Sequence, residues 1–375
     1  MKSLSKNRLS VWLYGQVIDL VFLLRKIPAK ATPPPFRLMQ IGSLFWQSRA
    51  LYVATRLGLA DAIGDERKSV RKIAGELQLS EEHLYRLLRM LDSMGVFEEV
   101  LPRIFRNNPT SSFLRLENPQ NVRAMILMHN SPEMTRPWME PLEECIRDGG
   151  VPFERVHGAN LFSHMDRNKA FDMLFADAMD VVDNLTGSAY LDDFDWSAFD
   201  RIIDIGGSKG AKSVSILKIA PGLESLVFDR PQVIEAAASH WEEREPRELT
   251  TRLSFQAGDM FDHLPAAVSD KDLYIFFAIF HGLGDDDAKR LLRNLRNAIG
   301  SYGARALIVD CVARESNIGP VVAGFDMQML IGTRGRERTL SEWKALLAGA
   351  GFRISDIVAV RSFASFIVAE LDRLD

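Results

Sequence analysis

The sequence predicts an α/β protein made of two folded parts. From residue 200 onward, continuous apolar strands alternate with amphipathic helices, which is the pattern of a parallel sheet covered by helices on both faces. This half is expected to be a doubly wound, Rossmann-like domain over residues 196–375. Residues 69–109 contain two short helical patterns followed by a hairpin pattern, which predicts a mainly helical winged-helix domain over residues 37–118.

The composition limits the classes of protein to consider. A chain of 375 residues is long enough for about two domains. The net charge of -4 gives no positive field that would favour nucleic acid. The only two cysteines, Cys145 and Cys311, provide neither a disulfide framework nor a zinc cluster and fit a reducing compartment.

Targeting and metal signals are also weak. The apolar run at residues 17–24 is far shorter than the roughly 20 residues of a membrane span, and no signal-peptide cleavage site follows it. The seven histidines show no ligand spacing with carboxylates. We therefore expect a cytoplasmic protein with no metal and no membrane contact.

Residues 1–36 form the first expected segment. Residues 1–30 carry an apolar stripe at helical spacing, which a lone helix cannot bury. The stripe must therefore pack on its own chain or dock on a partner. The following stretch "ATPPPF" (31–36) predicts a stiff extended linker. The stripe consists of Val11, Trp12, Tyr14, Val17, Ile18, Val21 and Leu24.

The winged-helix domain begins with an amphipathic helix expected over residues 44–63. Two further helices follow, with Ser69 and Ser80 as candidate N-caps. In a DNA-binding helix-turn-helix, the first residues of the second helix face the bases. Here they are Glu81 and Glu82, which would repel phosphates. Dimerisation is therefore the favoured role for this domain, and a DNA-binding regulator is the weaker alternative.

Residues 119–195 are expected to form a helical linker that serves as a lid over the substrate. The strongest helical pattern is "NKAFDMLFADAMD" (168–180). Its bulky side chains at Phe171, Phe175 and Met179 are either helix core or one wall of a pocket for an aromatic substrate.

The C-terminal half is expected to alternate in a fixed order. The strands are expected at 201–207, 224–229, 253–261, 272–281, 304–315, 354–360 and 363–371. The helices between them are expected at 211–221, 230–243, 285–300 and 341–352. Ligands of such domains bind beyond the carboxyl ends of the parallel strands.

A glycine turn, "DIGGSKG" (204–210), follows the first of these strands. Glycine allows positive φ and a close approach of the backbone to a ligand, so Asp204, Gly206, Gly207 and Gly210 are candidate cofactor-binding residues. The turn lacks the Walker pattern and the G-x-G-x-x-G pattern. Phosphate and nicotinamide cofactors therefore lose support.

Two more strand ends carry residues that suit a ligand, and each of these strand ends is called a corner of the expected cofactor site. Asp229 ends the second strand, where a carboxylate can bind both hydroxyls of a ribose. "GDMF" ends the third strand; Asp259 is placed for an adenine amino group, and Met260 and Phe261 flank the ring. These positions suit S-adenosylmethionine, which has a ribose, an adenine, a carboxylate and a cationic centre but no phosphates. Gly258 completes this corner.

His281 ends the fourth expected strand and is the candidate general base. Its ordinary pKa near 6.5 suits proton removal at neutral pH. Asp310, at the end of the fifth strand, and Glu337, in "RGRERT", are candidates to orient it. Without a role in catalysis, Asp310 would be a solvated strand end and Glu337 would be a helix cap.

Together these blocks resemble the class I S-adenosylmethionine-dependent O-methyltransferases of the plant caffeate type and their bacterial natural-product relatives. The resemblance spans nearly the whole chain, through "VHG" with "LF" (156–162), the glycine turn, "FDRPQVI", "GDMF", the His281 strand and "RGRERT" with "SEW", "LL" and "AGF". It implies a general base at His281, held by Asp310 and Glu337. It also implies a homodimer that exchanges N-terminal segments.

Further residues are expected in the cofactor site and in the substrate pocket. It implies cofactor contacts at Gly206, Asp229, Asp259 and Met260, to which we add Phe277. The substrate pocket is expected to include Phe280, Asp326 and Met327 together with the residues of 171–179 named above.

We therefore expect O-methylation of a phenol or enol of a small aromatic or polyketide-like metabolite. The chain departs from the family pattern at Ser208–Lys209, where a third glycine and a small residue are common, and at Gly282–Leu283, where Asp-Trp is usual. These departures keep open a C- or N-methyltransferase, or a relative that binds the cofactor but catalyses hydroxylation, decarboxylation or a pericyclic step.

Overall fold

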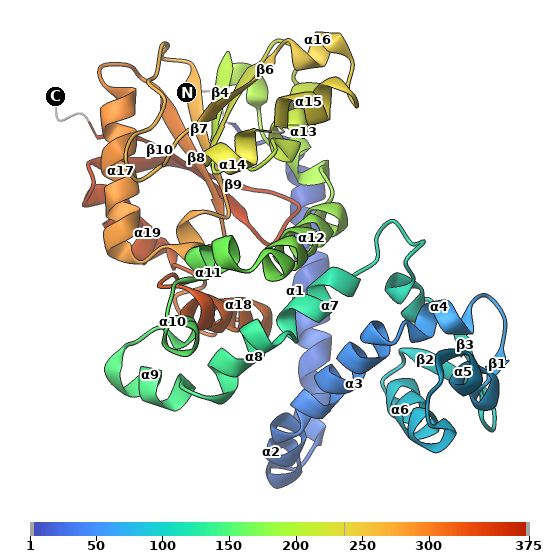
Figure 1. The fold of residues 1–375 in the computed structure, drawn as a ribbon. Helices are drawn as coiled ribbons and strands as arrows, with labels where there is room; N and C mark the ends of the chain where they lie inside the picture. The colour runs from blue at the N-terminus through green and yellow to red at the C-terminus, as the bar shows by residue number, and fades with distance from the viewer. Residues whose placement is uncertain (1–3, 236, 373–375) are drawn as a thin grey trace. The chain divides into compact units, whose positions relative to one another are not determined.

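The computed structural model describes residues 4–235 and 237–372 (Figure 1). The chain divides into two compact units. One unit spans Leu23–Gly187, and the other combines Met1–Phe22 with Ser188–Asp375.

The Leu23–Gly187 unit contains the expected winged helix. Strand β1 (Lys68–Ser69) leads into helix α5 (Val70–Leu77), which is followed by α6 (Glu81–Ser93). Strands β2 (Phe97–Leu101) and β3 (Ile104–Asn107) form the wing, and the three strands pair in the antiparallel order β1-β3-β2. The predicted helices and hairpin are thus confirmed.

The helix ends in this region test the predicted N-caps and helix boundaries. The Ser69 side chain caps α5 by accepting from the Lys72 backbone N–H, as predicted. Ser80 precedes α6, but its hydroxyl hydrogen-bonds His83 Nδ1 instead of the backbone. The single helix expected over 44–63 is wrong: α3 (Leu44–Arg56) and α4 (Leu59–Ile63) are separated at Gly58, whose φ of 66° breaks the helix.

The extended linker expected at residues 31–36 is also wrong. Helix α1 (Arg8–Ala31) is followed almost at once by α2 (Pro34–Gly42). Pro34 and Pro35 occupy the first turn of α2. Proline is compatible with that turn because its fixed φ is helical and its missing N–H would be unpaired there anyway. The prolines therefore start a helix.

The rest of this unit is helical, as expected for residues 119–195. Its elements are η1 (Ser111–Leu114), α7 (Arg123–His129), α8 (Pro132–Met139), α9 (Leu142–Asp148), α10 (Pro152–His157), α11 (Leu161–Arg167) and α12 (Lys169–Thr186). A separate small core holds them together, built around Met128, Met134, Phe153, Met165 and Phe171.

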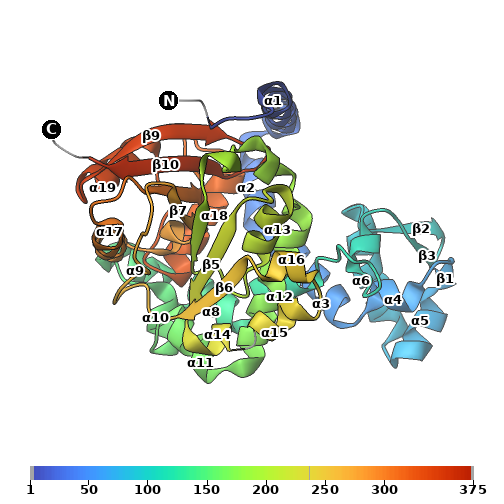
Figure 2. The same ribbon diagram turned by 90° about the horizontal axis from the view of Figure 1, so that it is seen from above.

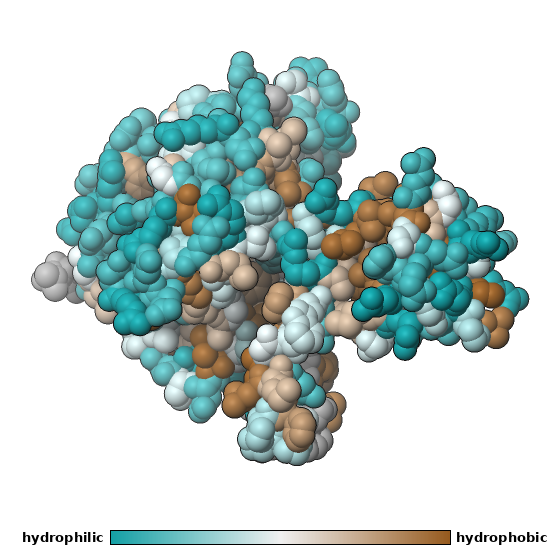
Figure 3. Space-filling view, turned by 60° about the horizontal axis from the view of Figure 1, so that its bottom comes forward, coloured by the Kyte–Doolittle hydropathy of each residue, from teal (hydrophilic) through white to brown (hydrophobic). Residues whose placement is uncertain are grey.

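Helices α1 to α3 leave many apolar side chains exposed. Trp12 is 58% exposed, and Val17, Phe36, Met39 and Trp46 are similarly open. Brown hydrophobic patches appear on the space-filling surface among teal residues (Figure 3). Single exposed apolar residues are common, but a run of this length is more than scattered exposure accounts for.

In the second unit, the described residues form a seven-stranded sheet in the order β6-β5-β4-β7-β8-β10-β9. Figure 2 labels β5, β6, β7, β9 and β10 of this sheet. The strands are β4 (Arg201–Ile205), β5 (Glu224–Asp229), β6 (Leu253–Ala257), β7 (Asp272–Phe277), β8 (Arg305–Asp310), β9 (Phe352–Ala359) and β10 (Ser365–Leu371). Strands β4 to β8 are parallel, and β10 is antiparallel to both its neighbours. The chain reverses direction across the sheet between β4 and β7, so their carboxyl ends form the switch point where ligands bind in such sheets.

Helices cover both faces of this sheet, which confirms the doubly wound prediction. On one face, α17 (Asp285–Ile299) and α19 (Leu340–Ala348) bury side chains such as Leu291 and Trp343 against the strands. On the other, α13 (Ala211–Ile219) and α16 (Arg247–Thr250) pack with η2 (Ala189–Asp193) and η3 (Trp196–Ala198). Apolar strands buried on both faces explain why the strands lack hydrophobic alternation.

Three further elements differ from expectation. The helix expected at 230–243 divides into α14 (Pro231–Ile234) and α15 (Ala237–Glu242), and α18 (Pro320–Gly332) was not predicted. Strand β7 ends at Phe277, so His281 lies in a 3₁₀ turn, η4 (Phe280–Gly282), rather than at the strand's end. Among the described residues, none of the helices is long and apolar enough to cross a bilayer.

Candidate active site

The glycine turn after β4 packs tightly against its surroundings. Gly206 has a φ of 71°, and a Cβ there would lie 2.6 Å from Ile279 Cδ1, in the turn after β7. A Cβ on Gly207 would lie 2.5 Å from the Asp204 carboxyl carbon. These glycines are therefore required by close packing at the switch point between β4 and β7.

Asp204 lies beneath this turn and is buried. Its Oδ2 accepts a hydrogen bond of 2.7 Å from the Ser213 hydroxyl, while Oδ1 has no partner among the residues described. Burial raises the pKa of Asp204 to about 7. An unsatisfied buried oxygen at the strand end is a place where a ligand or a water can donate a hydrogen bond.

Asp229, the last residue of β5, faces the same turn. Its Oδ2 accepts from the Ser208 N–H at 2.8 Å, and its Oδ1 accepts from the Arg230 N–H at 2.7 Å. Each carboxylate oxygen keeps a further lone pair for a ligand hydroxyl. Ser208 has a φ of 52°, a left-handed conformation that a third glycine would adopt without strain.

The third corner, Gly258–Phe261, lies in the loop after β6. A Cβ on Gly258 would lie 2.4 Å from the Phe228 ring, so only glycine fits. Asp259 is exposed, and its Oδ1 accepts from the Phe261 N–H at 2.8 Å. Met260 and Phe261 are partly buried against the sheet core. The sequence prediction that these corners come together at one end of the sheet agrees with the parallel pairing of β4, β5 and β6.

His281 is held by Glu337. Its Nδ1 lies 3.0 Å from Glu337 Oε1, and the His281 side chain is 25% exposed whereas that of Glu337 is 3% exposed. Burial lowers the pKa of His281, but the hydrogen bond to Glu337 and the charge of Asp310 outweigh it, so the net shift is upward. The imidazole is thus oriented through its Nδ1 contact and is partly exposed.

Asp310 supports the turn instead of the imidazole. The family resemblance implies that both carboxylates hold the ring, but Asp310 Oδ2 accepts from the Phe280 N–H at 3.1 Å. It is buried at the end of β8, and burial raises its pKa to about 7. Its role toward His281 is therefore electrostatic, while Glu337 makes the direct contact.

Arg338 is a residue that sequence reasoning missed. Its guanidinium is 1% exposed and donates to the carbonyls of Phe280 and Leu283, each at 2.7 Å, and to Asp285 Oδ1 at 2.8 Å. The available signal was its place in "RGRERT", directly after Glu337. A charged residue in a motif gives no sign of which backbone groups it will bind.

A polar pocket of about 300 Å³ adjoins Glu337. Its lining residues include Asp326, whose Oδ1 accepts from the Glu337 N–H at 2.9 Å. Glu337 Oε2 is buried and finds no hydrogen-bond partner in the described part of the chain. The remaining lining residues are Ala313, Arg314, Glu315, Ser316, Asn317, Ile318, Arg336, Thr339 and Glu342.

The expected substrate-pocket residues have mixed positions. Phe280 is 0% exposed and packs on Phe276 and Trp343 in the sheet core, so it does not line a pocket. Phe171 is buried in the helical core of the other unit, where Phe175 packs against it. Phe171 and Phe280 are therefore core residues, whereas Phe175 is only partly buried.

The other expected residues are more open. Met179, on α12, is exposed, and Met327, on α18, is partly buried. Phe277 ends β7 and packs against the sheet core opposite to that of Phe280.

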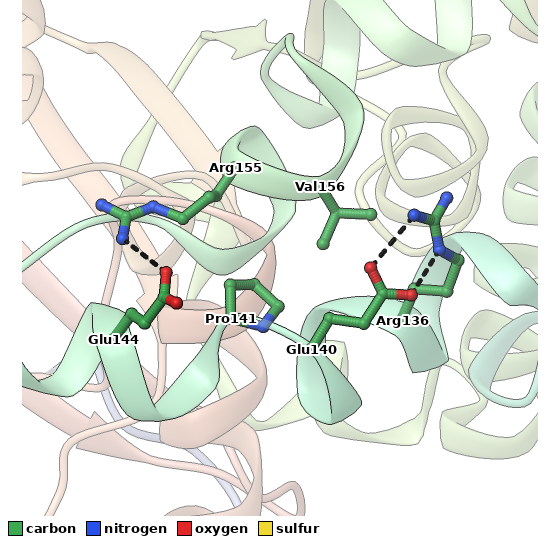
Figure 4. Close-up of a pocket in the computed structure, with 6 residues that line it drawn as sticks. All are labelled: Arg136, Glu140, Pro141, Glu144, Arg155 and Val156. Atoms are coloured by element: carbon green, nitrogen blue, oxygen red, sulfur yellow. Dashed lines mark hydrogen bonds and ion pairs between the residues drawn. The ribbon is translucent and has the colours of Figure 1, made fainter.

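A second pocket, of about 310 Å³, lies in the helical unit among Arg136, Glu140, Pro141, Glu144, Arg155 and Val156 (Figure 4). Arg136 donates to both oxygens of Glu140, at 2.7 and 3.0 Å, and Arg155 donates to Glu144 at 3.3 Å. Both guanidinium groups are thus already paired with carboxylates, so we assign this pocket no function.

Comparison with known proteins decides what this architecture is. Residues 138–353 match the family model of the O-methyltransferase domain, and residues 39–116 match that of the O-methyltransferase dimerisation domain. The chain belongs to the O-methyltransferase family. It is an S-adenosylmethionine-dependent O-methyltransferase with a dimerisation domain.

Two relatives illustrate the range of this family. The methyltransferase is 31% identical to phenazine O-methyltransferase PhzM of Lysobacter antibioticus, over 91% of this chain and 97% of the relative. It is also 31% identical to the 8-amino-8-demethylriboflavin N,N-dimethyltransferase of Streptomyces davaonensis, over 83% of this chain and 87% of that protein.

Solved structures agree. The structure titled LaPhzM superposes with a TM-score of 0.81 at 30% identity, covering 91% of this chain and all of that one. Human N-acetylserotonin methyltransferase, solved in complex with S-adenosylmethionine, gives a TM-score of 0.77 at 25% identity, covering 92% and 99% of the two chains.

The residues around the glycine turn fit S-adenosylmethionine. The orphan oxygen of Asp204 and the two lone pairs left on Asp229 provide acceptors at the ends of β4 and β5. The closely packed glycines let the backbone of the turn lie directly on Ile279 and Asp204 at the ends of the strands. The Lys209 side chain is exposed, and its carbonyl accepts from Trp241 Nε1 at 2.5 Å, which ties the turn to α15.

Proposed function

We propose that the methyltransferase methylates a phenol or enol hydroxyl of a small aromatic or polyketide-like metabolite, with His281 as general base. The observation that supports this most is the His281–Glu337 contact of 3.0 Å. It leaves one face of a partly exposed imidazole available beside the switch point of the sheet.

In this proposal, the cofactor lies across the ends of β4, β5 and β6. Backbone groups of Gly206 approach it, Asp229 binds hydroxyl groups, and Asp259 with Met260 and Phe261 binds the base. S-adenosylmethionine, when bound, supplies an electrophilic methyl group. The protein contributes chiefly the orientation of the acceptor oxygen.

His281 acts on the acceptor proton. Nδ1 is occupied by Glu337, so Nε2 is the nitrogen that can accept the proton of the hydroxyl. The resulting imidazolium is stabilised by the Glu337 carboxylate and by the charge of Asp310. Because a base must be neutral to accept a proton, activity rises with pH through the raised pKa of His281.

We further propose a division of the chain into working parts. Residues 37–118 serve dimerisation, residues 119–195 cover the substrate, and residues 196–375 hold the cofactor. The exposed apolar side chains of α1 to α3 support a homodimer in which residues 1–36 are exchanged between two copies.

His281→Asn tests the base. General-base catalysis contributes about 10²–10⁴-fold, so turnover should fall by that factor on a panel of hydroxylated phenols and naphthalenes. S-adenosylmethionine affinity, measured by calorimetry, should stay the same. His83→Asn, on α6 of the other unit, is the control. Near-normal turnover by His281→Asn would exclude the assigned role.

The same panel separates the alternative chemistries. Release of S-adenosylhomocysteine in proportion to product supports methyl transfer. Product formation without it would identify chemistry in which the methyl group stays on the cofactor. Amine acceptors belong in the panel because a relative of this chain is named as an N,N-dimethyltransferase.

A further inference from the structure

Arg338 is a buried cation whose hydrogen bonds within the described residues go to Phe280, Leu283 and Asp285, and not to the His281 ring or the cofactor corners. Its guanidinium donates through two different nitrogens to the carbonyls of Phe280 and Leu283. These two residues flank His281–Gly282. The donors therefore hold both ends of the turn that contains His281.

The same segment also touches the middle of that turn. A Cβ added to Gly335 would lie 1.9 Å from the His281 carbonyl oxygen and 2.7 Å from Gly282 Cα. Backbone packs directly on backbone here. The segment 335–338 thus contacts the 280–283 turn at its two ends through Arg338 and at its middle through Gly335.

The charge of Arg338 is costly to bury and is only partly compensated. An ion taken out of water loses several kcal/mol of hydration. Asp285, its carboxylate partner at 2.8 Å, is 45% exposed, and the Trp343 ring lies 5.5 Å from the guanidinium carbon. An apolar side chain would fill this space without that cost but could not satisfy two buried carbonyls.

The geometry points to a positioning role: we propose that Arg338 fixes the 280–283 turn so that His281 Nδ1 stays in contact with Glu337. The proposal rests on the base role assigned to His281. Glu337 and Arg338 are adjacent in sequence, so one backbone segment holds the imidazole by its side chain and the turn by its main chain. A shift of about 1 Å in such a group can cost about 10²-fold in rate.

Arg338→Lys is the central test. Lysine keeps the charge but has one nitrogen, which cannot reach two carbonyls and a carboxylate in the geometry of the planar fork. We expect turnover of the best panel phenol to fall about 10–100-fold, with unchanged affinity for S-adenosylmethionine. The pKa of His281 should return toward its ordinary value, because the contact with Glu337 loosens.

Arg361→Lys is the matched control. Arg361 is 28% exposed, donates to both oxygens of the buried Asp193 and to the Ala189 carbonyl, and is not among the described contacts of the 280–283 turn. It should lower the melting temperature and leave the pKa of His281 and turnover unchanged. If Arg338→Lys behaves in the same way, the positioning role is refuted.

The pKa is measured by NMR of protein with ¹³C-labelled histidine, with the His281 signal assigned by its loss in His281→Asn. This readout needs no acceptor, so it remains decisive even if His281→Asn shows that the proposed function is wrong. If Arg338→Lys does not fold, Asp285→Ala replaces it, since alanine offers no acceptor and so frees the exposed end of the guanidinium. A lowered pKa of His281 in that variant supports the proposal, and an unchanged one overturns it.

Discussion

The contact between His281 and Glu337 gives the sharpest prediction about catalysis. Glu337→Gln keeps the length and volume of the side chain and removes its charge. The Nδ1–H of His281 can still donate to the amide oxygen, so the imidazole keeps its orientation. Only the electrostatic part of the interaction is lost.

The size of the effect follows from the 3.0 Å bond. A hydrogen bond to a charged group contributes about 1.5–3 kcal/mol, and a neutral one about 0.5–1.5 kcal/mol. The difference between the middles of these ranges is about 1.3 kcal/mol, which corresponds to about tenfold in rate. Turnover should therefore fall about tenfold, less than in His281→Asn.

The pH dependence provides a second, independent sign. In the wild type the pKa of His281 is raised, and Glu337→Gln should lower it because burial then acts with less opposition. The midpoint at which kcat/KM rises with pH should move to lower pH. NMR titration of the His281 ring should show the same displacement.

Stability should change in the matching direction. A raised folded pKa contributes stability that is complete below the unfolded pKa of about 6.5 and is lost as pH rises through the folded pKa. Glu337→Gln should therefore cost more free energy of unfolding at pH 6 than at pH 9 in urea titrations.

Glu315→Gln is the control for both measurements. Glu315 lines the same polar pocket, but its oxygens bind the Ser341 N–H and hydroxyl. A pH profile that is the same in Glu337→Gln and in the wild type would refute the electrostatic account of this site.

Three further outcomes are expected. Gly335→Ala places a Cβ 1.9 Å from the His281 carbonyl oxygen. The variant should lose at least about 1–3 kcal/mol of stability in urea unfolding and should also lose methyl-transfer turnover. Wild-type stability would contradict this close approach. Ser208→Gly removes a left-handed non-glycine conformation that costs about 1–2 kcal/mol, which is partly offset by the entropy of about 0.5–1 kcal/mol that glycine loses. Calorimetry should show equal cofactor affinity, and urea unfolding should show stability higher by up to about 1.5 kcal/mol. A less stable variant would count against strain at this position. The double variant Trp12→Glu with Val17→Glu should be monomeric in light scattering, and a dimer would exclude this face of α1 from the interface.

The sequence alone determined the fold class because the hydrophobic pattern acts locally. Strands buried on both faces must be apolar throughout, and the glycine turn and the strand ends mark where such a sheet binds ligands. Glu337 could be proposed beside His281 only as one of two candidate carboxylates, and the family resemblance implied both. No rule of spacing relates residues 56 positions apart.

Only the tertiary structure decided which carboxylate of the site contacts the imidazole. Asp310 and Glu337 look equivalent in sequence, yet one binds the backbone of the turn and the other binds the ring. Phe280 was expected in the substrate pocket but is a core residue. In the 3₁₀ turn its side chain packs on Phe276 and Trp343, while His281 stays partly exposed.

Arg338 shows the same limit most clearly. Its partners are two backbone carbonyls about 55 residues earlier in the chain, and every residue type has a backbone carbonyl. No sequence pattern can therefore identify which carbonyls a buried arginine binds. That information exists only when the chain has folded and the 335–338 segment lies against the turn of His281.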